Sequence, residues 1–137
     1  MKPKDIILEF IRFVVIIALL IGVMYLLKTP FIEDNPTDKE YVTAIVGEAA
    51  NQTEDTMICV AHALRNRGNL HGVWGLTAKH IAKESKKTWK KAWVAWELSA
   101  HEPDNTHGAK NFGTYADLIK MDEVPDFHVQ CGDLYFY

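Results

Sequence analysis

The hydrophobic residues are distributed in two distinct ways along the chain. Between Ile6 and Leu27 almost every residue is apolar, and the charged exceptions are Glu9 and Arg12. A helix that spans a bilayer needs roughly 20 consecutive apolar residues, and an arginine near its end can extend the charge to the headgroups. The pattern therefore predicts a single N-terminal transmembrane helix within residues 1–28, with residues 6–27 in contact with the lipid bilayer.

Two other structures would begin with a similar apolar segment. A secretory signal peptide would end at a cleavage site of small residues, and the run from Met24 to Pro30 contains no such site. A buried core helix would need a second long hydrophobic segment to cover it, and the sequence has none. An uncleaved anchor is therefore the better interpretation.

The charges on either side of this anchor indicate its orientation. Lys2, Lys4 and Arg12 precede or open the apolar segment, whereas acidic residues soon follow Lys28. Because cytoplasmic flanks of membrane helices are enriched in Lys and Arg, we expect a single-pass membrane protein with a cytoplasmic N-terminus. Residues 29–36 contain two prolines and predict a linker. The domain that follows, residues 37–137, should then lie in the periplasm or otherwise outside the cytoplasm.

After the linker, apolar residues recur at helical spacing. Thr37 and Glu40 match a capping box, in which each side chain accepts a hydrogen bond from a free amide of the other residue. This predicts a first helix that runs to about Ala50. Thr53 then suits the N-cap of a second helix, and Gly68 is a natural residue for its end.

The rest of the domain gives weaker signals. A third helix is expected to begin near Thr77, and a fourth to run from about Thr88 to Ala100. Three tryptophans of the fourth helix share one side, where core packing is expected: Trp89, Trp93 and Trp96. The closing residues 134–137 have a strand-like composition. The predicted fold class of the domain is α+β and mainly helical.

Composition narrows the possible functions. The 137 residues suit one domain beside the anchor, and a net charge of -3 argues against binding to nucleic acid. The six histidines show no metal-ligand spacing, so neither a metal nor another cofactor is expected. Cys59 and Cys131 could form a disulfide in an oxidising compartment. Two buried free thiols are an equally good alternative.

Glu48 is the residue with the clearest catalytic potential. It lies near the end of an apolar helix, between Gly47 and Ala49, where its carboxyl could reach the floor of a cleft. Partial burial disfavours the ionised carboxylate and raises its pKa, as a general acid requires. Most glutamates near helix ends are solvated or paired with a cation, so this position alone does not separate the two roles.

Four segments, in sequence order, carry a family resemblance. They are residues 44–49 (Ala-Ile-Val-Gly-Glu-Ala), 60–67 (Val-Ala-His-Ala-Leu-Arg-Asn-Arg), 104–112 (Asp-Asn-Thr-His-Gly-Ala-Lys-Asn-Phe) and 131–137 (Cys-Gly-Asp-Leu-Tyr-Phe-Tyr). Together they resemble the SleB-like, spore-cortex-lytic cell-wall hydrolases. That family has a Gly-Glu-Ala segment, a helix ending in Asn-Arg, an Asp-Pro-Thr-x-Gly-Ala-x-x-Phe stretch and a closing Gly-x-His-x-Phe segment. The resemblance extends from about Tyr41 to the C-terminus.

The resemblance implies a small, lysozyme-like domain that cleaves the bond between N-acetylmuramic acid and N-acetylglucosamine in peptidoglycan glycan strands. Glu48 would be the catalytic acid and then the base. Capture of the cationic sugar by its own 6-hydroxyl would give 1,6-anhydro products, so a lytic transglycosylase is expected before a muramidase. No second acid is evident as a nucleophile. Such an economical enzyme also suits a bacteriophage endolysin or a virion-associated murein enzyme.

The expected substrate contacts belong to the matching segments or lie beside them. They are Gln52, Asn66, Arg67, Thr106, His107, Gly108, Ala109, Phe112 and Tyr115. Thr106 to Ala109 and the Asn66-Arg67 pair come from the family motifs. Phe112 and Tyr115 are aromatic side chains that flank one of those motifs and could contact a sugar.

The chain departs from the family pattern directly after the catalytic position. Residues 50–52 are Ala-Asn-Gln, where the family commonly has Arg-Gly-Glu. This departure motivates an alternative function, a membrane-tethered module that binds peptidoglycan without cutting it. A third alternative is an accessory subunit of a larger membrane or virion complex.

Six lysines would line one face of the third and fourth helices. They are Lys79, Lys83, Lys86, Lys87, Lys90 and Lys91. Such a face could bind anionic cell-wall polymers or lipid headgroups. An ordinary solvated surface is the simpler interpretation.

Overall fold

The computed structural model describes residues 3–28, 35–122, 124–126 and 128–137. The chain forms two compact units, Met1–Asp34 and Asn35–Tyr137. The first contains helix α1 (Pro3–Lys28), and the second contains all other helices and strands of the described residues. Most of the predicted linker, residues 29–34, lies outside the described residues.

The predicted transmembrane helix is not supported. Over the residues that the structure describes, no helix combines the length and the hydropathy that a membrane crossing requires. The predictions of a membrane anchor and of a single-pass location are therefore wrong.

The first two helices of the domain follow their capping residues. Helix α2 spans Asp38–Ala49, and Thr37 and Glu40 form the predicted capping box. Helix α3 spans Glu54–Arg67, with Thr53 as its N-cap and Gly68 in the left-handed conformation at its end, at a φ of 73°. Glycine adopts that conformation without a steric penalty. Both predicted helices are confirmed. Their ends could be predicted because a cap depends on residues within one turn of the helix end.

The predicted third helix is wrong. The segment forms two short 3-10 helices, η1 (Trp74–Thr77) and η2 (Ile81–Lys83), separated by an extended Ala78. The fourth helix exists as α4 (Lys86–Leu98), and it begins earlier than predicted because Ser85 caps it by accepting from the Thr88 amide. The regular helical face predicted for the lysines of this region is therefore interrupted.

The C-terminal part forms a small sheet. Strands β1 (Phe112–Thr114), β2 (Val129–Cys131) and β3 (Leu134–Phe136) are antiparallel and lie in the order β1-β3-β2. The short helix α5 (Tyr115–Leu118) follows β1 directly. A strand at the end of the chain was predicted, whereas β1, β2 and α5 were not. The described domain is mainly helical with a minor sheet, as the predicted fold class states.

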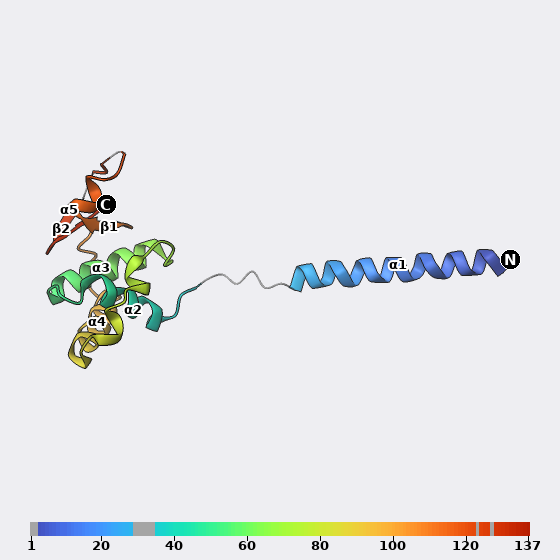
Figure 1. Cartoon of the computed structure of the whole chain (residues 1–137), viewed down its shortest axis with the longest axis horizontal. Helices are drawn as coiled ribbons and strands as arrows, with labels where there is room; N and C mark the ends of the chain where they lie inside the picture. The colour runs from blue at the N-terminus through green and yellow to red at the C-terminus, as the bar shows by residue number, and fades with distance from the viewer. Residues whose placement is uncertain (1–2, 29–34, 123, 127) are drawn as a thin grey trace. The chain divides into compact units, whose positions relative to one another are not determined.

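Helices α2, α3 and α4 pack on one another, and the sheet contacts α3 through β2 (Figure 1). Their core is apolar, and its largest fully buried side chains include Ile45, Met57, Leu64 and Phe136. Burying such side chains stabilises the fold by about 1.5–3 kcal/mol each. Phe136 belongs to β3, so the sheet shares the helical core.

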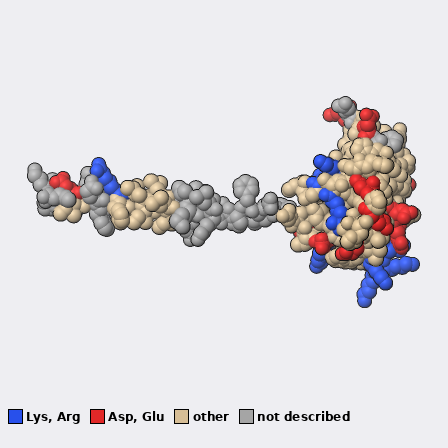
Figure 2. All heavy atoms as spheres, turned by 180° about the vertical axis from the view of Figure 1, so that it is seen from behind, with Lys and Arg blue, Asp and Glu red and all other residues tan. Residues whose placement is uncertain are grey.

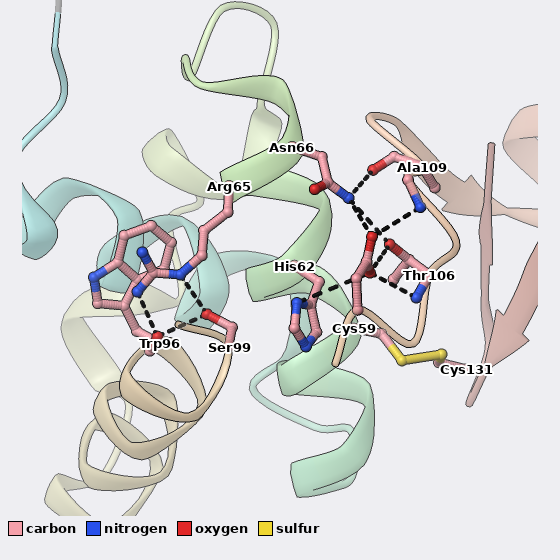
Figure 3. Close-up of polar contacts among 11 residues, drawn as sticks. Cys59, His62, Arg65, Asn66, Trp96, Ser99, Thr106, Ala109 and Cys131 are labelled. Atoms are coloured by element: carbon pink, nitrogen blue, oxygen red, sulfur yellow. Dashed lines mark hydrogen bonds and ion pairs between the residues drawn. A yellow bond between two sulfur atoms is a disulfide. The ribbon is translucent and has the colours of Figure 1, made fainter. Parts of the chain in front are cut away.

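A polar cluster joins the same three helices at the edge of this core. The Arg65 guanidinium lies 3.7 Å from the centre of the Trp96 ring and donates to the Ser99 hydroxyl at 2.6 Å (Figure 3). Tyr41 of α2 stacks on Trp96, with ring centres 4.5 Å apart. The Trp96 indole N–H donates to Asp38 at 2.9 Å. The core role predicted for Trp96 is confirmed, whereas the core role predicted for Trp93 is wrong because its side chain is exposed. Arg65 holds α3 against α4.

A disulfide connects the helices to the sheet. Cys59 of α3 and Cys131 of β2 are bonded, and their Cα atoms are 6.6 Å apart (Figure 3). Of the two alternatives left open by the sequence, the structure has the disulfide. The residues are 72 positions apart. A cross-link over a loop of this length restricts the unfolded chain strongly.

We expect the double substitution C59A/C131A to lower the free energy of unfolding by about 2–5 kcal/mol. Chemical denaturation followed by circular dichroism would measure this difference. The unchanged chain in the presence of a reducing agent is the control and should lose a similar amount. Equal stability of the variant and the oxidised chain would contradict a stabilising role for the bond.

Candidate active site

The domain contains a cleft of about 600 Å³ between its helical part and its sheet. Residues of α2, α3 and η1 form one side, and residues of β1, α5 and β3 form the other. The lining residues are Glu48, Arg67, Gly72, Val73, Trp74, Asn111, Phe112, Gly113, Thr114, Asp117, Lys120, Met121, Leu134 and Tyr137. This size and mixed polarity suit a small polar ligand or one part of a longer polymer.

Glu48 contributes a carboxyl group to this cleft from the last turn of α2. Its side chain is partly buried, and Oε1 accepts a hydrogen bond of 2.6 Å from the Gly75 amide. This bond fixes one carboxyl oxygen. The other oxygen, Oε2, can carry the proton that a general acid must donate.

Two glycines make this contact possible. A Cβ atom at Gly75 would lie 2.5 Å from the Glu48 Cγ and 2.6 Å from the Ala44 carbonyl oxygen. A Cβ atom at Gly47 would overlap the Gly75 carbonyl. Segment η1 can therefore lie directly on α2 only because both positions lack a side chain. The Gly47-Glu48 pair of the sequence motif thus has a steric explanation, although its partner Gly75 was not predicted.

Several neighbours influence the protonation of Glu48. Burial raises the pKa of its carboxyl above the ordinary value, and the Gly75 N–H opposes this change by stabilising the carboxylate. The charge of Asp117 raises the pKa further, and His80 lowers it. Because the net direction is upward, Glu48 keeps its proton to higher pH than an exposed glutamate, as general acid catalysis requires.

Asp117 is a second acid in the cleft, which the sequence did not reveal. Its Oδ2 accepts from the Thr114 hydroxyl at 2.6 Å and from the Thr114 amide at 3.1 Å. These bonds hold the pKa of Asp117 below its ordinary value, burial opposes them slightly, and nearby Lys120 lowers the pKa further. The cleft therefore contains one carboxyl with a raised pKa and one with a lowered pKa.

Aromatic side chains lie beside the two acids. Trp74 is 85% exposed, although it lines the cleft together with Phe112 and Tyr137. Large aromatic residues are usually buried for most of their surface. The exposed ring of Trp74 is therefore unusual, and it is available to a ligand. Trp74 was not predicted from the sequence. Its position directly before Gly75 is the one signal that connects it to Glu48.

Of the predicted site residues, Glu48, Arg67 and Phe112 come together in the cleft lining. The Arg67 guanidinium donates to the Asn69 side chain at 3.3 Å and to the His71 carbonyl. Arg67 therefore also shapes the loop that leads to Trp74.

Four other predicted residues take part in hydrogen bonds that hold the loop of residues 104–109 against α3. They are Asn66, Thr106, Gly108 and Ala109. Asn66 donates to Asp104 at 2.8 Å and to the Ala109 carbonyl at 3.1 Å (Figure 3). Asp104 also accepts from the Thr106 amide and hydroxyl and from the Gly108 amide. Burial opposes ionisation of Asp104, but these hydrogen bonds hold its pKa well below the ordinary value. Thr106 and Ala109 are buried, so the contacts of this motif in the described residues are internal.

The remaining predicted contacts also lie outside the cleft lining. Gln52 donates to the Asp133 carboxylate at 3.2 Å and accepts from its amide at 3.4 Å. His107 is exposed and has a positive φ of 54°. Tyr115 is 63% exposed, and its ring centre lies 6.1 Å from that of Tyr135. Their role in substrate binding stays a prediction.

Lys and Arg side chains lie in more than one place on the visible face of the domain, including its lower edge in Figure 2. Five of the six predicted lysines are exposed, and Lys91 lies 3.6 Å from the Glu54 carboxylate. Within the described residues, no group of three or more His, Cys, Asp or Glu side chains is placed to hold a metal ion.

Comparison of the chain with protein-family models, with curated proteins and with solved structures found no match. The resemblance to SleB-like hydrolases therefore stays a prediction from the residues.

We expect Gly47→Ala to destabilise the domain despite the better helix propensity of alanine. Alanine would add about 0.5–1 kcal/mol of stability in an open helix, but overlap with the Gly75 carbonyl should cost about 1–3 kcal/mol or more. Chemical denaturation would measure the net loss.

Gly113→Ala is the control for the Gly47 substitution. A Cβ at Gly113 would lie 3.5 Å from the nearest atom, an ordinary contact, so this variant should keep its stability. If Gly47→Ala were as stable as Gly113→Ala, the close approach of η1 and α2 would not be tight.

Proposed function

We propose that the domain cleaves the glycosidic bond between N-acetylmuramic acid and N-acetylglucosamine in peptidoglycan, with Glu48 as the acid. The observation that carries this proposal is the geometry of Glu48. Its carboxyl lies in a cleft, is partly buried, and has one oxygen fixed by the Gly75 amide at 2.6 Å. The resemblance of the segments around Glu48 to SleB-like enzymes supplies the substrate class.

The expected reaction begins when protonated Glu48 donates its proton to the glycosidic oxygen. The bond from that oxygen to C1 of the N-acetylmuramic acid breaks, and the sugar becomes cationic. Its own 6-hydroxyl attacks C1 and gives its proton to the Glu48 carboxylate, which restores the acid. The product is a 1,6-anhydro sugar, and the enzyme is a lytic transglycosylase.

Trp74 is the proposed platform for a sugar ring. The C–H face of a pyranose is apolar, and an aromatic ring provides a rigid apolar surface for it. Trp74 combines high exposure with a place in the cleft lining next to Gly75. A ring stacked there would lie beside the residue that orients Glu48.

A binding module that does not cut peptidoglycan is the second candidate function. The observation that favours it is Gln52, which occupies a position where the family has an acid and which bonds to Asp133 instead of lining the cleft. The same cleft would then hold a glycan strand without protonating it.

The first experiment incubates the full chain with purified peptidoglycan and identifies the released fragments by mass spectrometry. We expect fragments that end in 1,6-anhydro-N-acetylmuramic acid, and Glu48→Gln should lower the rate by about 10²- to 10⁴-fold. Glu97→Gln, at an exposed glutamate outside the cleft, is the matched control. Fragments with reducing ends would indicate a hydrolase with the same acid.

The pH dependence provides a further check of this reaction. Glu48 must be protonated, and its raised pKa should keep the enzyme active above the ordinary glutamate pKa of about 4.3. The rate should then fall as the pH rises through the pKa of Glu48. Binding of glycan without any release would support the binding module instead.

We expect Trp74→Ala to raise the KM for peptidoglycan by about twofold to tenfold, because a stacked aromatic contact contributes about 0.5–1.5 kcal/mol. Steady-state rates at several peptidoglycan concentrations would measure this change. Trp93→Ala removes a tryptophan that is 39% exposed and lies outside the cleft lining, so it should leave KM unchanged. Equal KM values for the two variants would exclude Trp74 as the platform.

A further inference from the structure

The cleft contains two carboxyl groups that come from opposite sides of it. Glu48 belongs to α2, and Asp117 belongs to α5, which follows β1 of the sheet. Both residues line the same cleft, and the negative charge of Asp117 raises the pKa of Glu48. Nothing in the sequence motifs connects them, because only the packing of the sheet beside α3 places Asp117 there.

The contacts of Asp117 leave part of its carboxylate available. Both hydrogen bonds from Thr114 end on Oδ2, and the side chain is exposed to solvent. These bonds complete a capping box at the start of α5, so they also fix the position of the carboxylate. A fixed and accessible negative charge in a cleft can stabilise a positive charge that develops on a ligand.

We propose that Asp117 is the second carboxylate of the reaction, whose negative charge stabilises the cationic sugar formed when Glu48 protonates the glycosidic oxygen. This proposal rests on the proposed function for its substrate. When the bond between C1 and the leaving oxygen breaks, both electrons stay with that oxygen, which receives the Glu48 proton. The positive charge shared by C1 and the ring oxygen then lies in the field of Asp117 until the 6-hydroxyl attacks.

Other polar groups in the cleft and beside it act on the same site. His80, which precedes η2, lowers the pKa of Glu48, and the Gly75 amide of η1 acts in the same direction. Arg67 at the end of α3 and Lys120 after α5 add positive charge to the lining. Asp117 is therefore the carboxylate that offsets the positive charges of Arg67 and Lys120 within the described lining.

The first test measures the coupling of the two acids without any substrate. The carboxyl carbon of Glu48 is followed by NMR during a pH titration of the full chain and of Asp117→Asn. Asparagine keeps an acceptor for the Thr114 hydrogen bonds but has no charge. The pKa of Glu48 should fall in this variant, because a neighbouring negative charge no longer disfavours its ionisation.

Asp122→Asn is the matched control. Asp122 is an exposed acid outside the cleft lining, and its substitution changes the net charge by the same amount. The titration of Glu48 should stay unchanged in this variant. An unchanged Glu48 titration in Asp117→Asn would overturn the proposal, whether or not the protein cuts peptidoglycan.

The second test measures the reaction with peptidoglycan. Asp117→Asn should lower kcat by about 10- to 100-fold with little change in KM. The alkaline limb of its pH profile should move to lower pH, because Glu48 loses its proton earlier. If kcat is unaffected, Asp117 does not stabilise the cationic sugar and the proposal fails.

Thr114→Val separates the charge of Asp117 from its structural role. Valine removes the hydroxyl that caps α5 and donates to Asp117, but it keeps the charge of the carboxylate and the hydrogen bond from the backbone amide of residue 114. Its Glu48 titration should stay near that of the unchanged chain, and its kcat should fall less than that of Asp117→Asn. Equal losses would mean that capping of α5 explains the effect, which would overturn the proposal. A shifted titration with no glycan release from the unchanged chain would contradict the proposed function alone.

Discussion

The close approach of Gly75 to α2 is the contact on which the candidate site depends. It brings a backbone amide to 2.6 Å from the Glu48 carboxyl and orients that group in the cleft. Gly47 and Gly75 are both required, because a Cβ at either position would collide with the other segment. The same contact places Trp74, which directly precedes Gly75 in the chain, in the lining of the cleft that contains Glu48. Acid and aromatic surface are thus positioned by one packing event.

The opposite side of the cleft depends on different interactions. Strand β1 and α5 carry Phe112 and Asp117, and β1 joins the domain through β3. Asn66 fastens the preceding loop through Asp104, and Phe136 of β3 is buried in the helical core. Several motif residues that resemble a family signature therefore support the loop and the sheet, and the shape of the cleft relies on them indirectly.

Local signals in the sequence predicted local structure well. Thr37 and Thr53 capped the helices that were expected, because a cap involves residues within one turn. The prediction of a third helix was wrong because hydrophobic spacing near Thr77 does not distinguish an α-helix from short 3-10 turns. Glu48 could be identified as a candidate residue from its neighbours in the sequence. Asp117 could not, because its place in the cleft is set by tertiary packing. The membrane helix was inferred from hydropathy alone, and the described part of α1 does not meet the requirement.

The disulfide has a topological consequence for the intact molecule. Cys59 and Cys131 enclose a loop that contains Trp74, Gly75 and Asp117, while Glu48 lies outside it. A protease that cut the exposed segment around Ile119 would produce two polypeptides that are still covalently joined. They would migrate as one species in a denaturing gel until a reductant separated them. Integrity of the backbone and integrity of the molecule are therefore separate properties in this protein.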